Sequence, residues 1–408
     1  MNSYLDNAEK PSSSRLILLS LFISSYAMYP SQLVITVLLV EIAGDFDLPL
    51  GVSAQIRSFS LAIALFTALA VGALSIKYRK KSLLIAGLIA LALSAIGCGV
   101  SMSFETLILF YVFTGLGVTM VGPMATALVG DHFPAEERAN ALAWYGAAGG
   151  ISHMVGSQVI GFIAALGGWR MAFLAYSLPI SLLSIALVSS QLPPEKVDIQ
   201  RSSRSILTGF RNVLSDRSAL ACLTGITLAT AAWQGIYFFS VSFLKQELSM
   251  PPILAAGIYS IMSLLFTMGS LSSGRIIGKM GRKPALLLGL MVIVIFTVTY
   301  TNLPFLSLVL FCNIVGCYFG AIRNMSSIGL SLEQVPDSRG TMMSLNSAAM
   351  RIGSLLGTSI GGLTIIVYGW RALGLLFGSA GILSALIYIL FVKDPIKPIS
   401  SQAGASSR

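Results

Sequence analysis

His153, Arg323 and Arg351 fall in the interior of apolar stretches of this sequence, and Arg57 falls near the end of another. A buried guanidinium keeps its charge and offers a planar set of donors that matches a carboxylate or another anionic group. An imidazole changes charge near neutral pH, so His153 could take up and release a proton. The residues therefore indicate anion binding by Arg323 and Arg351 and proton transfer by the histidine. The alternative for each is a packing role. A carbonyl would then satisfy His153, and helix carbonyls, Asn324, Asn346 or cavity water would satisfy the arginines.

Aromatic and amide residues form a second set on two stretches far apart in the sequence, one around Pro30 and one around Gln234. Helical spacing places several of them on one face. An amide facing lipid is costly, so this pairing indicates the wall of a cavity for a small organic solute. Taken singly, each aromatic could instead pack or face lipid. The predicted substrate-binding residues are Tyr26, Tyr29, Gln32, Trp233, Gln234, Tyr237, Asn313, Tyr318, Arg323, Asn346 and Arg351.

The composition is that of a membrane protein, with 10% of residues charged, 55% hydrophobic and a mean hydropathy of +0.84. Apolar runs of about twenty residues, enough to cross a hydrocarbon core of about 30 Å, recur along the chain. The predicted fold is all-α, with twelve transmembrane helices. They are expected at 16–40, 52–75, 82–101, 106–130, 141–166, 171–192, 219–243, 253–277, 284–301, 305–331, 341–367 and 372–392.

The distribution of Lys and Arg predicts the orientation. With both termini in the cytoplasm, cytoplasmic segments hold twenty of the twenty-six basic residues, and the outer segments hold three. This asymmetry indicates a multi-pass protein of the cytoplasmic membrane, and it accounts for most of the net charge of +10 without nucleic-acid binding. All four cysteines fall inside predicted spans, so we expect packing residues and no disulfide.

The second half of the sequence repeats features of the first about 201 positions later. Gly167-Gly168-Trp169-Arg170 returns as Tyr368-Gly369-Trp370-Arg371, and Gly115 returns as Gly316. Such a repeat predicts two pseudo-symmetric six-helix bundles that meet at a solute site. The expected domains are a cytoplasmic tail at 1–14, bundles at 15–192 and 218–393, a cytoplasmic linker with a surface helix at 193–217, and a tail at 394–408.

Two equivalent basic loops follow the second and eighth spans. Segments that begin with an acidic residue and end with an arginine, Asp131 to Arg138 and Glu333 to Arg339, follow the fourth and tenth. With the repeated Gly-Trp-Arg entries, the chain over about 15–393 resembles the major facilitator superfamily, most closely the twelve-helix drug, sugar and metabolite efflux permeases of prokaryotes. The resemblance implies a central cavity lined by spans one, four, seven and ten, with gates at two and eleven and at five and eight. The expected gating residues are Gly72, Lys77, Lys80, Lys81, Arg138, Gly274, Lys279, Gly281, Arg282, Lys283 and Arg339.

Three positions depart from the family pattern. Ile76 and Gly278 stand where the basic loops usually carry Asp, and Tyr111 stands where proton-driven exporters usually carry Arg on span four. The span-five signature of antiporters is reduced to Gly156-Ser157-Gln158-Val159-Ile160-Gly161. The parts of the pattern most closely tied to proton antiport are therefore altered.

The sequence predicts a secondary transporter that moves a small organic solute by alternating access, with efflux by proton antiport as the family default. The alternatives are an organic-anion carrier or uniporter that uses the intramembrane arginines, and a receptor or scaffold that no longer transports. We expect no enzyme activity, because no nucleophile–base pair, metal-ligand cluster or carboxylate pair falls within the spans. No cofactor, metal or nucleic acid is expected, and the chain is expected to be a monomer in the bilayer.

Overall fold

The computed structural model describes residues 11–193, 211, 213–303 and 305–394. Ten stretches of this part are long and apolar enough to cross a membrane. Two of them, of 52 and 53 residues, are each interrupted by a glycine with positive φ, Gly168 and Gly369. Counting these two as paired crossings gives the predicted twelve. The tails at 1–10 and 395–408 and the linker segments 194–210 and 212 lie outside the described residues, and so does most of the surface helix expected there. Of its described end, Val213 is buried in the core of unit 2 and Leu214 is exposed.

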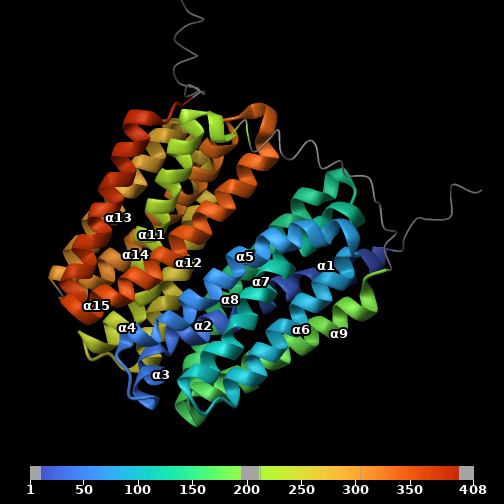
Figure 1. The fold of residues 1–408 in the computed structure, drawn as a ribbon, viewed down its shortest axis with the longest axis horizontal. Helices are drawn as coiled ribbons and strands as arrows, with labels where there is room; N and C mark the ends of the chain where they lie inside the picture. The colour runs from blue at the N-terminus through green and yellow to red at the C-terminus, as the bar shows by residue number, and fades with distance from the viewer. Residues whose placement is uncertain (1–10, 194–210, 212, 304, 395–408) are drawn as a thin grey trace, which may run out of the picture. The chain divides into compact units, whose positions relative to one another are not determined.

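The described residues divide into two compact units, and residues 43–61 group with the second. Unit 1 holds residues up to Ile42 and those from Ala62 to the end of the first half. Its helices (Figure 1) are α1 (Pro11–Ala27), α2 (Pro30–Val37), the start of α3 (Leu39–Asp45), most of α5 (Gln55–Lys77), α6 (Lys80–Gly99), α7 (Phe104–His132), α8 (Ala135–Ala172), the π-helix η1 (Phe173–Ser177) and α9 (Leu178–Gln191).

Unit 2 holds residues 43–61 and the second half of the chain. The short α4 (Leu50–Ser53) belongs to it. Its longer helices (Figure 1) are α11 (Arg217–Gln246), α12 (Pro252–Met280), α13 (Arg282–Asn302), α14 (Leu306–Leu332), the 3₁₀ turn η2 (Pro336–Ser338) and α15 (Arg339–Phe391). α15 contains the last two predicted spans, because Gly369 bends the chain without ending the helix.

Turns at equivalent places in the two halves share their backbone geometry. Asp47 and Ser249 both adopt positive φ, 51° and 49°. Two residues later, Pro49 and Pro251 occupy the N-cap of α4 and α12 with matching extended geometry. The repeat seen in the sequence is therefore also a repeat of backbone conformation. The first span departs from its prediction as one helix, since α1 ends at Ala27 and α2 starts at Pro30, which has no N–H to continue the helix.

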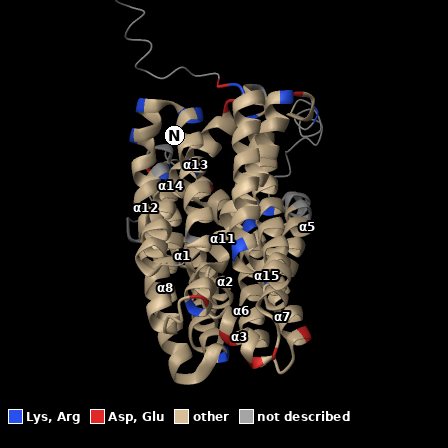
Figure 2. Ribbon diagram, turned by 90° about the vertical axis from the view of Figure 1, so that its left-hand side faces the viewer, with Lys and Arg blue, Asp and Glu red and all other residues tan. Residues whose placement is uncertain are grey.

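Each unit has its own core, and the charged residues lie mostly towards helix ends (Figure 2). The core of unit 1 is built from α1, α6, α7 and α9 and includes Leu21, Val121 and Val188. The core of unit 2 is built from α11, α13, α14 and α15. With few charges in their middle portions, the helices suit a lipid surrounding.

Candidate functional site

In unit 1, the predicted aromatic residues form a cluster with hydroxyl and imidazole groups. The hydroxyl oxygens of Tyr26 and Tyr176 lie 2.5 Å apart. The ring of Tyr29 meets the ring of His153 edge-on, with centroids 4.9 Å apart. Gly149 makes this contact feasible, since a Cβ there would lie 2.8 Å from the Tyr29 hydroxyl. The structure thus brings Tyr29 and His153 together, which sequence spacing did not predict.

The hydrogen bond of His153 fixes the tautomer of its neutral ring. Its Nδ1 lies 2.9 Å from the carbonyl oxygen of Gly149. A carbonyl only accepts, so Nδ1 carries the hydrogen of the neutral ring. Gln32, in contrast, donates to the carbonyl of Met28 at 2.7 Å within its own helical segment.

In unit 2, the predicted aromatics form a row of stacked rings. Trp233 stacks on Tyr237 with centroids 5.3 Å apart and an interplanar angle of 16°. The other neighbour of Trp233 is Phe266, at 6.0 Å, and Tyr237 continues the row to Tyr259 at 5.1 Å. Gly320 provides the space beside the indole, because a Cβ there would lie 2.6 Å from it. Parallel and tilted rings at these distances attract one another beyond their apolar burial.

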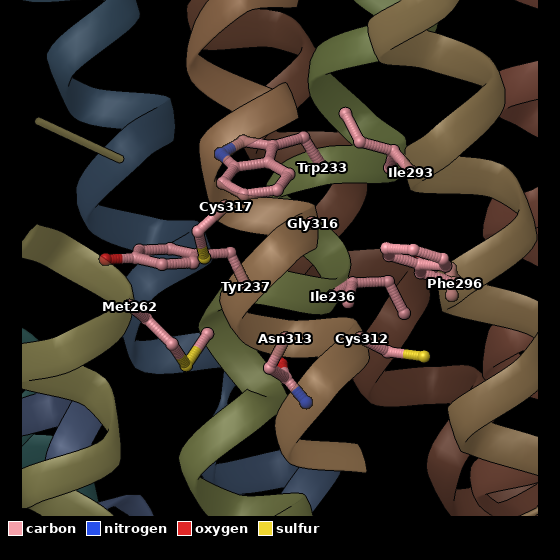
Figure 3. Close-up of a pocket in the computed structure, with 11 residues that line it drawn as sticks. Trp233, Ile236, Tyr237, Met262, Ile293, Phe296, Cys312, Asn313, Gly316 and Cys317 are labelled. Atoms are coloured by element: carbon pink, nitrogen blue, oxygen red, sulfur yellow. The ribbon is translucent and has the colours of Figure 1, made fainter. Parts of the chain in front are cut away.

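A small pocket lies next to this row, inside unit 2 (Figure 3). Trp233 and Tyr237 from α11 border it, and Asn313 from α14 supplies an amide whose Nδ2 donates to the Val309 carbonyl at 2.9 Å. The remaining lining residues are Ile236, Met262, Ile293, Phe296, Thr297, Cys312, Gly316 and Cys317. The pocket is therefore mostly apolar and aromatic, with one amide.

The five other predicted substrate-binding residues of unit 2, Arg323 among them, are not part of this pocket lining. The Tyr318 hydroxyl forms a 2.8 Å hydrogen bond with Ser272, and Asn346 accepts one from Ser331 at 3.1 Å. Gln234 is half-buried on α11, and Arg351 is half-buried on α15.

Arg323 is only 2% exposed. It makes no hydrogen bond or ion pair with any residue that the structure describes, and its Nε is a buried donor without an acceptor.

The basic loops bind the helix ends of their own unit. In unit 1, Lys81 Nζ donates to the carbonyls of Ser189 at 2.9 Å and Leu192 at 2.5 Å, at the end of α9. In unit 2, Lys283 Nζ donates to Ile389 at 3.2 Å and Val392 at 2.7 Å, at the end of α15. A cation at a helix C-terminus satisfies the last carbonyls and complements the helix dipole.

The preceding basic residue in each loop forms an ion pair. Lys80 pairs with Asp131, and Arg282 pairs with Glu333 at 3.2 Å. Arg339 joins the second pair, 3.4 Å from Glu333. These equivalent contacts hold the loop after the second or eighth span to the end of the fourth or tenth.

The other predicted gating residues lie near helix ends. Arg138 donates from Nε to the Phe133 carbonyl at 2.9 Å. Gly281 ends α12 with a φ of 91°, and Lys279 lies in the last turn of that helix. Gly274 has open space around it. Gly72 and Lys77 lie in the last turns of α5, and the side chain of Lys77 lies outside the described part of the structure.

Residues 43–61 pack closely on α15 within unit 2, a contact that sequence reasoning did not resolve to residues. A Cβ at Gly51 would lie 2.0 Å from the carbonyl oxygen of Gly362. Nearby, Gln55 donates to the Ser359 carbonyl at 3.3 Å, and the hydroxyls of Ser58 and Thr358 lie 3.2 Å apart. The signal in the sequence was the density of small residues along α15, which permits close helix contacts.

Arg57 lies in the same segment, near the predicted outer end of the second span. Its guanidinium lies over the ring of Phe238, 4.8 Å from the centroid. No group of three or more His, Cys, Asp or Glu side chains among the described residues could hold a metal ion.

A model of the Major Facilitator Superfamily matches residues 17–337 and 308–407. The chain belongs to this superfamily. It is 27% identical over 315 residues to YceJ, an uncharacterized MFS-type transporter of Bacillus subtilis, covering 76% of this chain and 78% of the relative. It is 24% identical over 212 residues to the chloramphenicol resistance protein CraA of Acinetobacter baumannii, covering 52% and 50%.

The same fold occurs in a bacterial homologue of the human lysosomal transporter Spinster, solved in an inward-facing, unoccupied conformation. The TM-score is 0.77 at 17% identity, covering 95% of this chain and 99% of that one. The chain is therefore an all-helical membrane transporter of small solutes, with twelve transmembrane helices in two six-helix bundles.

Proposed function

We propose that this transporter exports a small organic solute from the cytoplasm in exchange for protons, by alternating access. The aromatic and amide character of both predicted cavity walls, from Tyr26 to Gln32 and from Trp233 to Tyr237, carries the proposal. Such walls suit a mostly apolar solute with a few polar groups. The name of the relative CraA, a chloramphenicol resistance protein, supports an organic solute and the outward direction.

The orientation in this proposal places both termini in the cytoplasm. Twenty of the twenty-six Lys and Arg residues then fall on the cytoplasmic side, as the positive-inside rule expects. The stacked row in unit 2 and the Tyr29–His153 contact in unit 1 would offer ring edges and faces to the solute. The segment 43–61 and α15 would act as the outer gate that the family pattern assigns to the second and eleventh spans.

His153 is the proposed proton carrier. No Asp or Glu falls in the middle of an apolar span, so the histidine is the titratable group placed at that depth. Protonation at Nε2 would convert a neutral ring into a cation beside Tyr29, and deprotonation on the other side would complete the cycle. Moving one charge through 100 mV supplies about 2.3 kcal/mol, which supports a concentration gradient of roughly fiftyfold.

The test uses the purified protein in liposomes, with chloramphenicol as the probe and an imposed pH gradient. We expect the gradient to accelerate efflux in the wild type and in His132→Gln, since His132 lies in the last turn of α7. We expect His153→Gln to retain counterflow and lose the acceleration. Equal acceleration in both variants would rule out His153 as the carrier.

A second candidate is an organic-anion carrier or uniporter. Arg351 favours it, because a half-buried guanidinium on a membrane helix offers an anion a planar pair of donors. That function predicts benzoate transport that is indifferent to the pH gradient and lost in Arg351→Gln. Benzoate transport that survives this substitution would eliminate the candidate.

A further inference from the structure

The guanidinium of Arg323 is enclosed by helices of unit 2. The Cβ of Arg323 lies where α13 and α14 meet, and a Cβ added to Gly289 would lie 2.7 Å from it. Tyr388 on α15 is near enough to interact with it electrostatically. The Tyr388 hydroxyl does not neutralise the charge, since it is itself bonded to Ser327 at 3.4 Å and to the Cys222 carbonyl at 3.5 Å.

Unit 1 shows that the fold does not need a charge at this place. There, a Cβ on Gly87 would lie 2.9 Å from the Cβ of Met120, 3.0 Å from Val121 Cγ2 and 3.1 Å from the Gly117 carbonyl. Gly289 meets the Phe319 carbonyl, and both of these residues lie 202 positions after Gly87 and Gly117. At this offset the counterpart of Arg323 is Val121, which is fully buried in the core of unit 1.

The residues around Arg323 are also more polar than those at the equivalent positions of unit 1. Polar residues of unit 2 replace a set of buried hydrocarbon residues at offsets of 200 to 202 positions. The polar set is Cys222, Arg323, Ser326, Ser327, Ser331 and Tyr388, and the matching core residues of unit 1 are Leu21, Val121, Met124, Ala125, Val129 and Val188.

Ser326 is a second unsatisfied group of this polar set. Its hydroxyl is fully buried and has no hydrogen-bond partner, as is the case for Arg323 Nε. Three positions separate the two residues on α14, so they lie on neighbouring parts of one helix face. Both groups can donate a hydrogen bond, and neither has a carboxylate to receive one.

An enclosed arginine without a counter-charge is unfavourable. A guanidinium does not lose its proton in a protein, so it cannot relieve the cost by becoming neutral. Leaving a buried charge uncompensated is strongly destabilising, whereas an anion would accept the free donors and cancel the charge. We propose that Arg323 and Ser326 form an internal site for a small monovalent anion, either a halide or a small carboxylate. The site depends on neither the direction nor the coupling of transport.

The test measures the melting temperature of the purified full-length protein in sodium gluconate, sodium chloride and sodium formate at equal ionic strength. Gluconate is too large for an enclosed site. We expect chloride or formate to raise the wild-type Tm by about 3 °C at 100 times Kd, and Arg323→Val to lose this response. Arg275→Gln, at an exposed arginine of α12, is the matched control and should keep it. A response to chloride alone identifies a halide site, and a response to formate identifies a carboxylate site.

Two further results complete the test. In gluconate, Arg323→Val should melt higher than the wild type, because it removes the uncompensated charge and restores the residue found in unit 1. If Arg323→Val does not fold, a titration of Arg323→Lys decides, and its half-saturating anion concentration should be at least about tenfold higher than that of the wild type. An equal anion response in the wild type and the Arg323 variants would overturn the proposal.

Discussion

Gly51→Ala tests whether the packing of residues 43–61 on α15 must open during transport. The added Cβ would lie 2.0 Å from the Gly362 carbonyl oxygen and 2.7 Å from Ile366 Cγ1, whereas ordinary contact begins at 3.4 Å. The two backbones would have to separate by about 1.4 Å, the difference between 3.4 and 2.0 Å. Overpacking of this kind costs about 1–3 kcal/mol, which shifts a two-state equilibrium about 5- to 150-fold.

The assay follows a reporter thiol on α15. Thr358 is fully buried in this contact, so Thr358→Cys reacts with a membrane-impermeant maleimide only when the contact opens. The four native cysteines are buried, which keeps the background low. We expect Gly51→Ala to raise the labelling rate at least about fivefold and to slow transport, because the closed form becomes rarer.

Gly44→Ala is the matched control for this experiment. It adds the same methyl group to the same segment, where nothing lies within 4 Å of the added Cβ. Labelling and transport should then equal those of Thr358→Cys alone. If Gly51→Ala behaves as Gly44→Ala does, the contact is not a gate and the steric reasoning fails.

Two further predictions concern the features that the halves share. Lys81→Met and Lys283→Met should each lower the Tm by about 2 °C, because each leaves helix-end carbonyls without their cation, whereas Arg275→Met, at an exposed position before the last turn of α12, should leave the Tm unchanged. Equal melting of all three variants would contradict the capping role. Gly168→Ala should destabilise the protein by about 1 kcal/mol, since its φ of 77° disfavours a side chain, and Gly146→Ala should not. A denaturant titration that finds Gly168→Ala neutral would contradict the strain.

The membrane fold was predictable from the sequence, because a span of about twenty apolar residues is a strong local signal. Glycines between spans five and six and between spans eleven and twelve were also visible, and the structure assigns Gly168 and Gly369 to the bends. The break before Pro30 could have been predicted from the missing N–H. These features depend on a few neighbouring residues, and sequence reasoning recovers such features well.

Contacts between segments far apart in the chain could not be predicted from the sequence. The grouping of residues 43–61 with α15 depends on two backbones approaching at Gly51 and Gly362, and no local pattern records their pairing. The sequence repeat of about 201 positions pairs Arg323 with Gly122, whereas the glycine-to-carbonyl contacts of Gly87 and Gly289 are 202 positions apart and pair it with Val121.

The matched lysine caps have a practical consequence for engineering this chain. Lys81 and Lys283 fasten equivalent helix ends with equivalent bonds, while the interiors they enclose differ in chemistry. Each half therefore serves as an internal reference for the other. A residue can be moved from the core of one unit to the equivalent position of the other, where the helix ends are held by the same bonds. The difference in stability between the two reciprocal substitutions then measures the free-energy cost of a polar side chain at that position.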